Sequence, residues 1–179
     1  MNMKCSVYVA TSLDWYIALS DWDISWLDNM PNPENDDFGF SEFMSTIDAI
    51  IMWRKTFEKV LTFWFWPYDK PVFILSSKII DIPNELKWKV EQIAWNPKEI
   101  LLKASAFGFG SLYIDWWKTI QSFIEENLIN EITITRVPIL LWDWIPLFSK
   151  NPKIQELEHI ETSVLLNGLV KSRYKFKTI

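Results

Sequence analysis

The stretch Ala49-Ile50-Ile51-Met52-Trp53-Arg54-Lys55-Thr56 joins a short apolar run to a helix pattern that opens with two cations and a hydroxyl. The apolar run is typical of a buried strand, and apolar residues then recur at helical spacing over 54–61. Free N–H groups at the start of a helix attract anions, whereas cations there oppose the helix dipole. The stretch therefore indicates a strand-to-helix junction. A phosphate site and a solvated basic first turn are both open interpretations of it.

Alternating strand and helix patterns extend from this junction over the first two thirds of the chain. Besides 49–52, strands are predicted at 4–10, 71–75, 90–94 and 112–114. Helices are predicted at 38–46, 54–61, 97–107 and 119–127, with Pro97 in a first turn and Gly108 and Gly110 after the same helix. Residues 11–25 are polar and turn-prone, and we expect a long irregular loop there. Such alternation implies parallel strands joined by crossover helices.

The last third of the chain shows strand patterns alone. Residues 131–137 alternate apolar and polar side chains, and two further runs, 160–166 and 169–178, flank Asn167-Gly168. Asn-Gly between two such runs is a strong hairpin signal. The whole pattern predicts an α/β fold, with a mixed sheet flanked by helices and a C-terminal antiparallel hairpin. No repeat, linker or low-complexity segment divides the chain, so residues 1–179 are expected to form one domain.

Tryptophan stands where the local sequence favours glycine. The 179 residues include 12 Trp and only 4 Gly, although glycine is normally about 7% of a protein. Trp26 and Trp66 look ordinary, but the others occupy turns or element ends, where glycine supplies a positive φ at little steric cost. These others are Trp15, Trp22, Trp53, Trp64, Trp88, Trp95, Trp116, Trp117, Trp142 and Trp144. Because glycine turns often approach a phosphate, the pattern marks candidate ligand contacts.

Two more strand ends carry polar side chains. Leu75-Ser76-Ser77-Lys78 offers hydroxyls and an ammonium to phosphate or ribose oxygens, although an ordinary turn explains it better. The second is Tyr113-Ile114-Asp115-Trp116-Trp117-Lys118-Thr119. With glycine in place of its two tryptophans it becomes a strand, a Gly-Gly turn and a helix start, which is a pyrophosphate cradle. The alternative is that two aromatic residues pack in a hydrophobic surface.

The composition excludes several classes of protein. A net charge of −5 gives no support for nucleic-acid binding, which usually needs a basic face. No apolar run reaches the roughly 18 residues of a membrane span. Cys5 lies in an apolar run and is expected to be buried. His159 has no cysteine partners, so we expect it on a surface strand and expect no metal site. Because no signal-peptide pattern occurs, the expected compartment is the cytoplasm.

Together these junctions resemble the dihydrofolate reductase-like superfamily. The chain is most similar to the reductase domain of riboflavin biosynthesis, the C-terminal half of the bifunctional deaminase-reductase, in a small stand-alone form. The matching stretches follow the family's order and span most of the chain: 12–18, 48–58, 65–67, 113–119 and 136–148. The departure is systematic, because Trp15, Trp53, Trp116, Trp117, Trp142 and Trp144 stand where the family pattern has glycine.

The resemblance implies an NADPH-dependent reductase on a mixed sheet of about eight strands. It implies that the cofactor phosphates lie at two turns. One turn comprises Trp53, Arg54, Lys55 and Thr56, and the other comprises Ile114, Trp116, Trp117, Lys118 and Thr119. Ser76 and Ser77 are expected near the adenosine, Ala10, Ile17 and Ala18 near the nicotinamide, and Asp36 or Asp37 near the substrate.

The implied reaction is hydride delivery from NADPH to a C=N or carbonyl carbon. The implied small-molecule substrate is pterin-like or an aminopyrimidine ribosyl phosphate, as in 5-amino-6-(5-phosphoribosylamino)uracil reductase. A dihydrofolate reductase is one alternative, and it needs a firmly placed pocket carboxylate. The other is a non-enzymatic protein whose cofactor site is blocked by indoles. The late strands and exposed aromatic residues also predict a homodimer, which a monomeric mass in light scattering would contradict.

Overall fold

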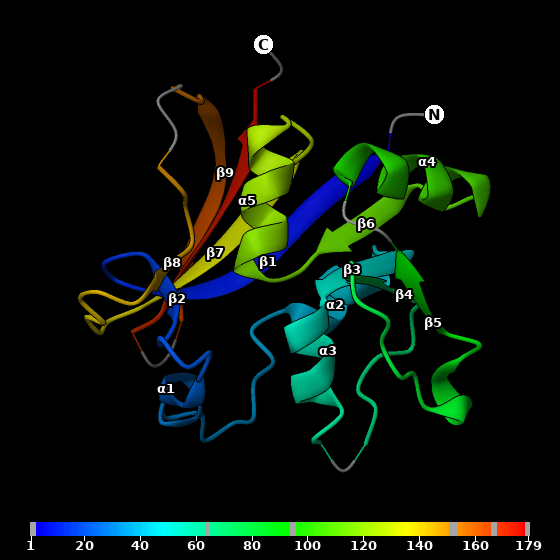
Figure 1. Cartoon of the computed structure of the whole chain (residues 1–179). Coiled ribbons are helices and arrows are strands. Elements are labelled where there is room, and N and C mark those ends of the chain that lie inside the picture. Colours follow the sequence, from blue (N-terminus) through cyan, green and yellow to red (C-terminus); the bar gives the residue numbers. More distant parts are fainter. Residues whose placement is uncertain (1–2, 64, 94–95, 151–153, 166–167, 178–179) are drawn as a thin grey trace.

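The computed structural model describes residues 3–63, 65–93, 96–150, 154–165 and 168–177. Strands and helices alternate first and strands follow alone, as the sequence predicts (Figure 1). The elements are β1 (Lys4–Ser12), β2 (Tyr16–Ala18), α1 (Ser25–Asp28), α2 (Phe40–Ser45), β3 (Ala49–Trp53), α3 (Arg54–Val60), β4 (Val72–Leu75), η1 (Asn84–Leu86), β5 (Val90–Ile93), α4 (Pro97–Ala106), β6 (Ser111–Ile114), α5 (Trp117–Glu125), β7 (Glu131–Val137), β8 (Ile145–Pro146), β9 (Leu157–Val164) and β10 (Val170–Phe176).

One eight-stranded sheet carries the fold, in the order β5-β4-β3-β6-β1-β7-β10-β9. Neighbouring strands are parallel from β5 to β7, and β10 runs antiparallel to both β7 and β9. The predicted mixed sheet with a C-terminal antiparallel pair is therefore confirmed. The sequences of β3 and β4 are continuous apolar runs because both faces of these parallel strands are buried.

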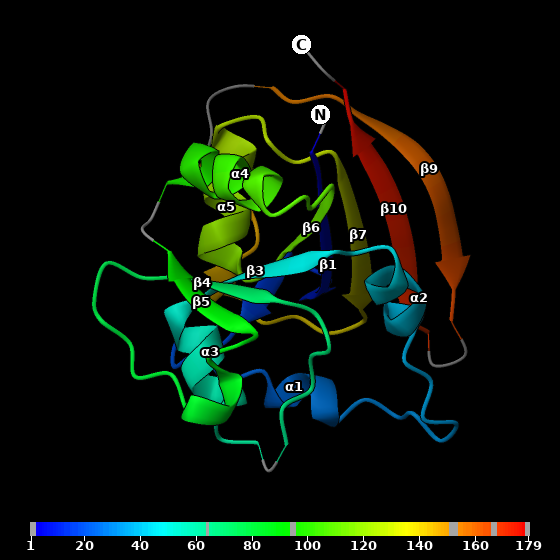
Figure 2. The ribbon, with the colours of Figure 1, turned by 90° about the vertical axis from the view of Figure 1, so that its right-hand side faces the viewer.

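Helices cover both faces of the sheet (Figures 1 and 2). On one face, α4 and α5 pack through fully buried side chains such as Ile100 of α4 and Phe123 of α5. On the other, α2 and α3 pack over Met52, and Phe57 of α3 is fully buried there. A third cluster surrounds Trp26. Burying such a side chain is worth about 1.5–3 kcal/mol, so these layers fix the strand ends firmly.

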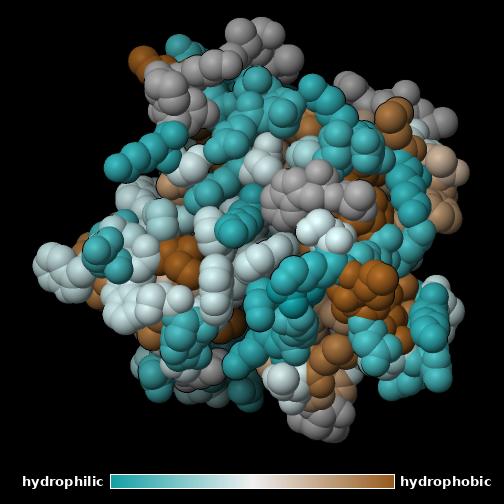
Figure 3. Space-filling model, viewed as in Figure 1, coloured by the Kyte–Doolittle hydropathy of each residue, from teal (hydrophilic) through white to brown (hydrophobic). Residues whose placement is uncertain are grey.

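The outer surface mixes polar and apolar side chains. Figure 3 shows hydrophilic residues interleaved with smaller hydrophobic patches on the side seen in Figure 1. Within the described ranges, no helix has the length and apolar character needed to cross a membrane. The same residues contain no cluster of histidine, cysteine and acidic side chains that fits a metal ion.

The prediction of an irregular loop at 11–25 is wrong. β1 continues to Ser12 because it pairs with β7 as far as Val137, and Tyr16–Ala18 forms β2 against β8. The carboxylate of Asp14 links this turn to a distant segment of the chain. It accepts hydrogen bonds from the backbone N–H groups of Leu141 and Trp142 at 3.1 and 2.8 Å. These contacts are far apart in sequence, so local patterns do not show them.

The structure also tests several smaller predictions from the sequence. α5 begins at Trp117, earlier than the predicted start at Thr119, and ends at Glu125. Gly108 follows α4 with a φ of 81°, as expected for a residue that ends a helix. Cys5 is fully buried, and His159 is exposed on β9. Asn167 of the predicted hairpin turn, Trp64 and Trp95 lie outside the described residues.

Candidate active site

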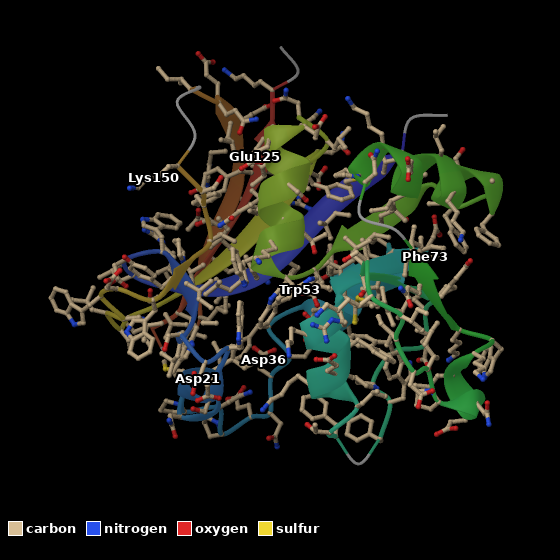
Figure 4. All side chains as sticks on the ribbon, viewed as in Figure 1. Asp21, Asp36, Trp53, Phe73, Glu125 and Lys150 are labelled. Atoms are coloured by element: carbon tan, nitrogen blue, oxygen red, sulfur yellow. The ribbon has the colours of Figure 1, made fainter. Side chains whose placement is uncertain are left out.

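Three of the predicted junctions meet at one edge of the sheet. β3 lies between β4 and β6, with Trp53 paired to Leu75 and Ile51 paired to Ile114. The first turns of α3 and α5 therefore lie next to each other at the carboxyl ends of these strands, and Figure 4 labels Trp53 between them. In open α/β sheets, ligands bind at the carboxyl ends of parallel strands.

Each of these two helices carries an unpartnered hydroxyl in its first turn. Thr56 of α3 and Thr119 of α5 are 8% and 0% exposed. Neither side-chain oxygen has a hydrogen-bond partner among the residues that the structure describes. A buried hydroxyl left unsatisfied costs about 1–3 kcal/mol. Two such hydroxyls at adjacent helix starts are the kind of donor that phosphate oxygens satisfy.

Four indoles cover the same edge. The rings of Trp53, Trp116 and Trp117 lie 5.4, 6.4 and 5.8 Å from the ring of Trp22, and Trp117 stacks on Trp22 at 15°. We call these four residues the indole cluster. The Nε1 atoms of Trp116 and Trp117 are buried and have no acceptor within the described part of the chain. The cluster therefore fills space at the predicted phosphate positions with apolar rings.

The cations of the predicted phosphate site already have partners. Arg54 forms an ion pair with Glu58, and the Nζ of Lys55 lies 3.2 Å from the same carboxylate. The Nζ of Lys118 lies 5.1 Å from the ring centre of Trp53 and 5.2 Å from that of Trp117. A cation over an indole is attracted by the ring's electron density. These charges are thus held by protein groups.

Backbone angles divide the tryptophans into two groups. Trp15, Trp22, Trp116 and Trp142 have φ between 67° and 73°, the left-handed region that favours glycine. Trp53 has a φ of −80°, and Trp117 is a helical residue. The prediction of a positive φ is thus confirmed at these four positions and wrong at Trp53, Trp117, Trp88 and Trp144. At Trp53 and Trp117 glycine would relieve crowding rather than backbone strain.

A cavity of about 630 Å³ opens beside the indole cluster. Its walls come from α3, from the loop before α1 and from the end of β6. They include Lys55, Thr56, Trp22, Trp116, Asp115, Tyr68 and Tyr113. Three predicted site residues thus line a space large enough for a ligand, while Asp115 and the two tyrosines were not assigned a role from sequence. The sequence signal for Asp115 was its place directly after a buried strand.

Asp115 is a carboxyl group held in a largely apolar wall. Its Oδ1 accepts hydrogen bonds from the Oη of Tyr113 at 3.0 Å and from the N–H of Trp116 at 2.9 Å. Burial raises the pKa of Asp115 to about 6, against the lowering effect of these two donors. Because both donors occupy Oδ1, a bound proton belongs on Oδ2. Asp115 can therefore hold a proton at the cavity wall near neutral pH.

This pKa has a measurable consequence for stability. Because the pKa of Asp115 is higher in the folded chain than in the unfolded chain, its protonated form stabilises the fold. This contribution to the free energy of unfolding is complete below pH 3.8, the usual pKa, and is lost as the pH rises through about 6. Asp115→Asn keeps an acceptor for Tyr113 and Trp116 but cannot ionise. The unfolding free energy of the unmodified chain, relative to this variant, is expected to fall by about 2–3 kcal/mol between about pH 4 and about pH 7. Urea unfolding at both pH values measures this, and a constant difference would exclude the raised pKa.

Neither predicted substrate carboxylate, Asp36 or Asp37, lines the cavity beside the indole cluster. Asp37 and Ala10 line a second cavity of about 250 Å³, together with Tyr8 and Phe38. The carboxylate of Asp37 accepts from the N–H groups at the start of α2, at 2.8 and 2.9 Å. Hydrogen bonding by the Ser41 side chain, and then by these N–H groups, lowers the pKa of Asp37. Asp36 is exposed, and its carboxylate accepts from Phe38 N–H at 2.8 Å. The role of both aspartates in orienting a substrate stays a prediction.

The remaining predicted contact residues are buried in the core or lie in a local turn, and their contacts with the cofactor stay predictions. Ile17, Ala18 and Ile114 are buried in the core beneath α4 and α5. The hydroxyl of Ser76 donates to the carbonyl of Lys78 at 2.7 Å within its own turn, and Ser77 is exposed. The interpretation of Ser76-Ser77 as an ordinary turn therefore has support, and a contact with adenosine stays a prediction.

The hydrogen-bond donors at this edge suit the phosphates of a dinucleotide, but the indole cluster occupies the space that these phosphates need. Thr56 and Thr119 supply unpartnered hydroxyls, and Lys55 and Lys118 supply charge. The indole cluster lies over the same helix starts, and Thr119 is wholly covered. The residues present in this chain therefore do not fit the phosphates of NADPH.

Comparisons with known proteins agree with this architecture. No protein-family model matches the chain. The Bacillus subtilis (strain 168) protein YwjB is 31% identical over 151 residues, which cover 83% of this chain and 84% of YwjB. A protein from Shewanella sp. PV-4 that is assigned to riboflavin biosynthesis has a crystal structure 40% identical in sequence. It superposes with a TM-score of 0.91 over 98% of this chain and 100% of that one.

More distant solved structures share the fold. A pyrimidine reductase-like protein from Corynebacterium diphtheriae is 16% identical, with a TM-score of 0.71 over 99% of this chain and 93% of that one. Dihydrofolate reductase from Enterococcus faecalis, complexed with NADP(H), is 13% identical, with a TM-score of 0.67 over 98% and 97%. The chain therefore belongs to the dihydrofolate reductase-like superfamily, as a relative of riboflavin-biosynthesis proteins.

Proposed function

We propose that this chain has the framework of an NADPH-dependent reductase of an aminopyrimidine ribosyl phosphate, and that activity requires the carboxyl edge to be free of the indole cluster. The observation that carries the proposal is the pair of buried, unpartnered hydroxyls of Thr56 and Thr119. They lie in the first turns of two neighbouring helices, where backbone N–H groups also favour an anion. When bound, NADPH supplies hydride.

The chain's own residues have three tasks in this proposal. The first turns of α3 and α5 bind the phosphates through their hydroxyls and cations. The cavity of about 630 Å³ holds the reactants apart from bulk water. Asp115 holds a proton on Oδ2 at the wall of this cavity, since Tyr113 and the N–H of Trp116 occupy Oδ1. Positioning of this kind, rather than new chemistry, is what a protein adds to a cofactor.

Two other functions compete with this proposal. A dihydrofolate reductase requires a pocket carboxylate that is free for the substrate. The carboxylate of Asp37 is instead bonded to the N–H groups of Gly39 and Ser41. A non-enzymatic role is favoured by the indole cluster itself, which covers the phosphate positions. The aminopyrimidine reductase and the non-enzymatic role differ in what happens once the indoles are removed.

NADPH oxidation by the variant Trp53→Gly/Trp116→Gly/Trp117→Gly tests the proposed function. We expect turnover with 5-amino-6-(5-phosphoribosylamino)uracil or its 2-amino precursor, which has not yet been deaminated, and slower turnover with dihydrofolate. The unmodified chain is the control and is expected to show little turnover. NADPH binding without turnover of either pyrimidine would overturn the substrate class, whereas failure to bind NADPH would overturn the cofactor. The homodimer also stays a prediction, which a mass measured by light scattering would test.

A further inference from the structure

Tryptophan is unusually frequent in the left-handed backbone region of this chain. Among the described residues, a positive φ occurs at four tryptophans, three glycines, two asparagines and Phe38. The left-handed conformation costs an L-residue roughly 1–2 kcal/mol, and bulky side chains almost never adopt it. The tryptophans Trp15, Trp22, Trp116 and Trp142 therefore share the backbone geometry of Gly39, Gly108 and Gly168.

Packing offsets only part of this strain. Trp142 is 74% exposed, so its indole gains little from burial. Trp15 is 40% exposed and contacts the ring of Phe148 and the guanidinium of Arg136, and Trp22 packs within the indole cluster. A ring contact of this kind contributes about 0.5–1.5 kcal/mol, which does not exceed the roughly 1–2 kcal/mol cost of one left-handed L-residue. Glycine at these turns would avoid that cost.

Two other tryptophans differ from these in backbone angle and packing, although their Nε1 atoms are also buried without an acceptor among the described residues. Trp26 has an 8% exposed side chain in a core cluster. Trp66 packs edge-on against Phe57 and Tyr68, with ring centres 5.9 and 5.4 Å apart. Neither has a positive φ. These two are the ones that also look ordinary in sequence, so the chain contains two kinds of tryptophan position.

We infer that the polypeptide made in the cell of origin carries glycine at positions 15, 22, 116 and 142, and tryptophan at positions 26 and 66. Positions 53 and 117 belong to the glycine group because their indoles complete the cluster that covers Thr56 and Thr119. A single codon that the cell decodes as glycine, and that differs from the codon of Trp26 and Trp66, would explain why tryptophan alone stands in place of glycine at all of these positions. Independent substitutions would scatter over many types. The inference does not rest on the proposed function.

Peptide mapping by tandem mass spectrometry tests this inference on the protein isolated from its own cells. The expected result is glycine at 15, 22, 53, 116, 117 and 142, with tryptophan at 26 and 66 as internal controls. The printed sequence, produced from a synthetic gene with the standard tryptophan codon at all of these positions, is the matched control for the mapping. Tryptophan at 15, 22, 116 and 142 in the native protein would overturn the inference. This outcome is separate from any failure of NADPH binding or turnover.

Discussion

Replacing Trp53, Trp116 and Trp117 together by glycine is expected to strengthen NADPH binding at least about thirtyfold, since two freed hydroxyls contribute about 1–3 kcal/mol each. The physical reason is volume as well as bonding. The three indoles converge with Trp22 over the starts of α3 and α5, where Thr56 and Thr119 have no partner. Isothermal titration calorimetry of the variant and of the unmodified chain measures the difference.

Two controls show whether the gain comes from the proposed contacts. Thr119→Val in the triple-glycine background removes one hydroxyl at nearly constant volume, and we expect it to reverse part of the gain. Trp88→Gly in the unmodified chain changes an indole that is 76% exposed between η1 and β5, and we expect no gain. If the triple variant binds NADPH no better than the unmodified chain, the indoles do not obstruct the site.

The variant Trp15→Gly/Trp22→Gly/Trp116→Gly/Trp142→Gly is expected to be more stable than the unmodified chain by roughly 2–4 kcal/mol. Relief of left-handed strain contributes roughly 1–2 kcal/mol at each position, and the entropy of glycine in the unfolded chain offsets about 0.5–1 kcal/mol of it. All four positions have φ between 67° and 73°. Urea unfolding gives the free energy directly.

A pair of single variants separates strain from surface effects. Trp142 and Trp88 are 74% and 76% exposed, but only Trp142 has a positive φ. We therefore expect Trp142→Gly to stabilise the chain and Trp88→Gly to leave it unchanged or less stable. Equal effects of the two substitutions would show that φ does not decide the outcome.

The main sheet was predictable because its central strands are continuous apolar runs. Ala49–Trp53 and Val72–Leu75 are buried on both faces, so burial alone marks them in the sequence. β2, β8 and α1 were not predicted, because they are short and depend on distant partners. The N–H of Leu147, for example, donates to the carbonyl of Trp15 at 2.9 Å.

The candidate site was predictable in position but not in composition. Helix starts after buried strands marked the regions of Thr56 and Thr119, and the sheet order brings them together. The importance of Asp115 was hidden, because burial at the end of β6 sets its pKa and no pattern in the local sequence reports that. The stacking of Trp22 on Trp117 was also hidden, since the two residues come from separate loops.

The central claim is that indoles occupy the phosphate positions at the carboxyl ends of β3 and β6. Titration of the unmodified chain with NADPH, followed by intrinsic fluorescence and by thermal unfolding, tests it most directly. The account predicts no saturable quenching and no rise in the unfolding temperature in the micromolar range. Saturable micromolar binding, with quenching of the indole cluster, would contradict it.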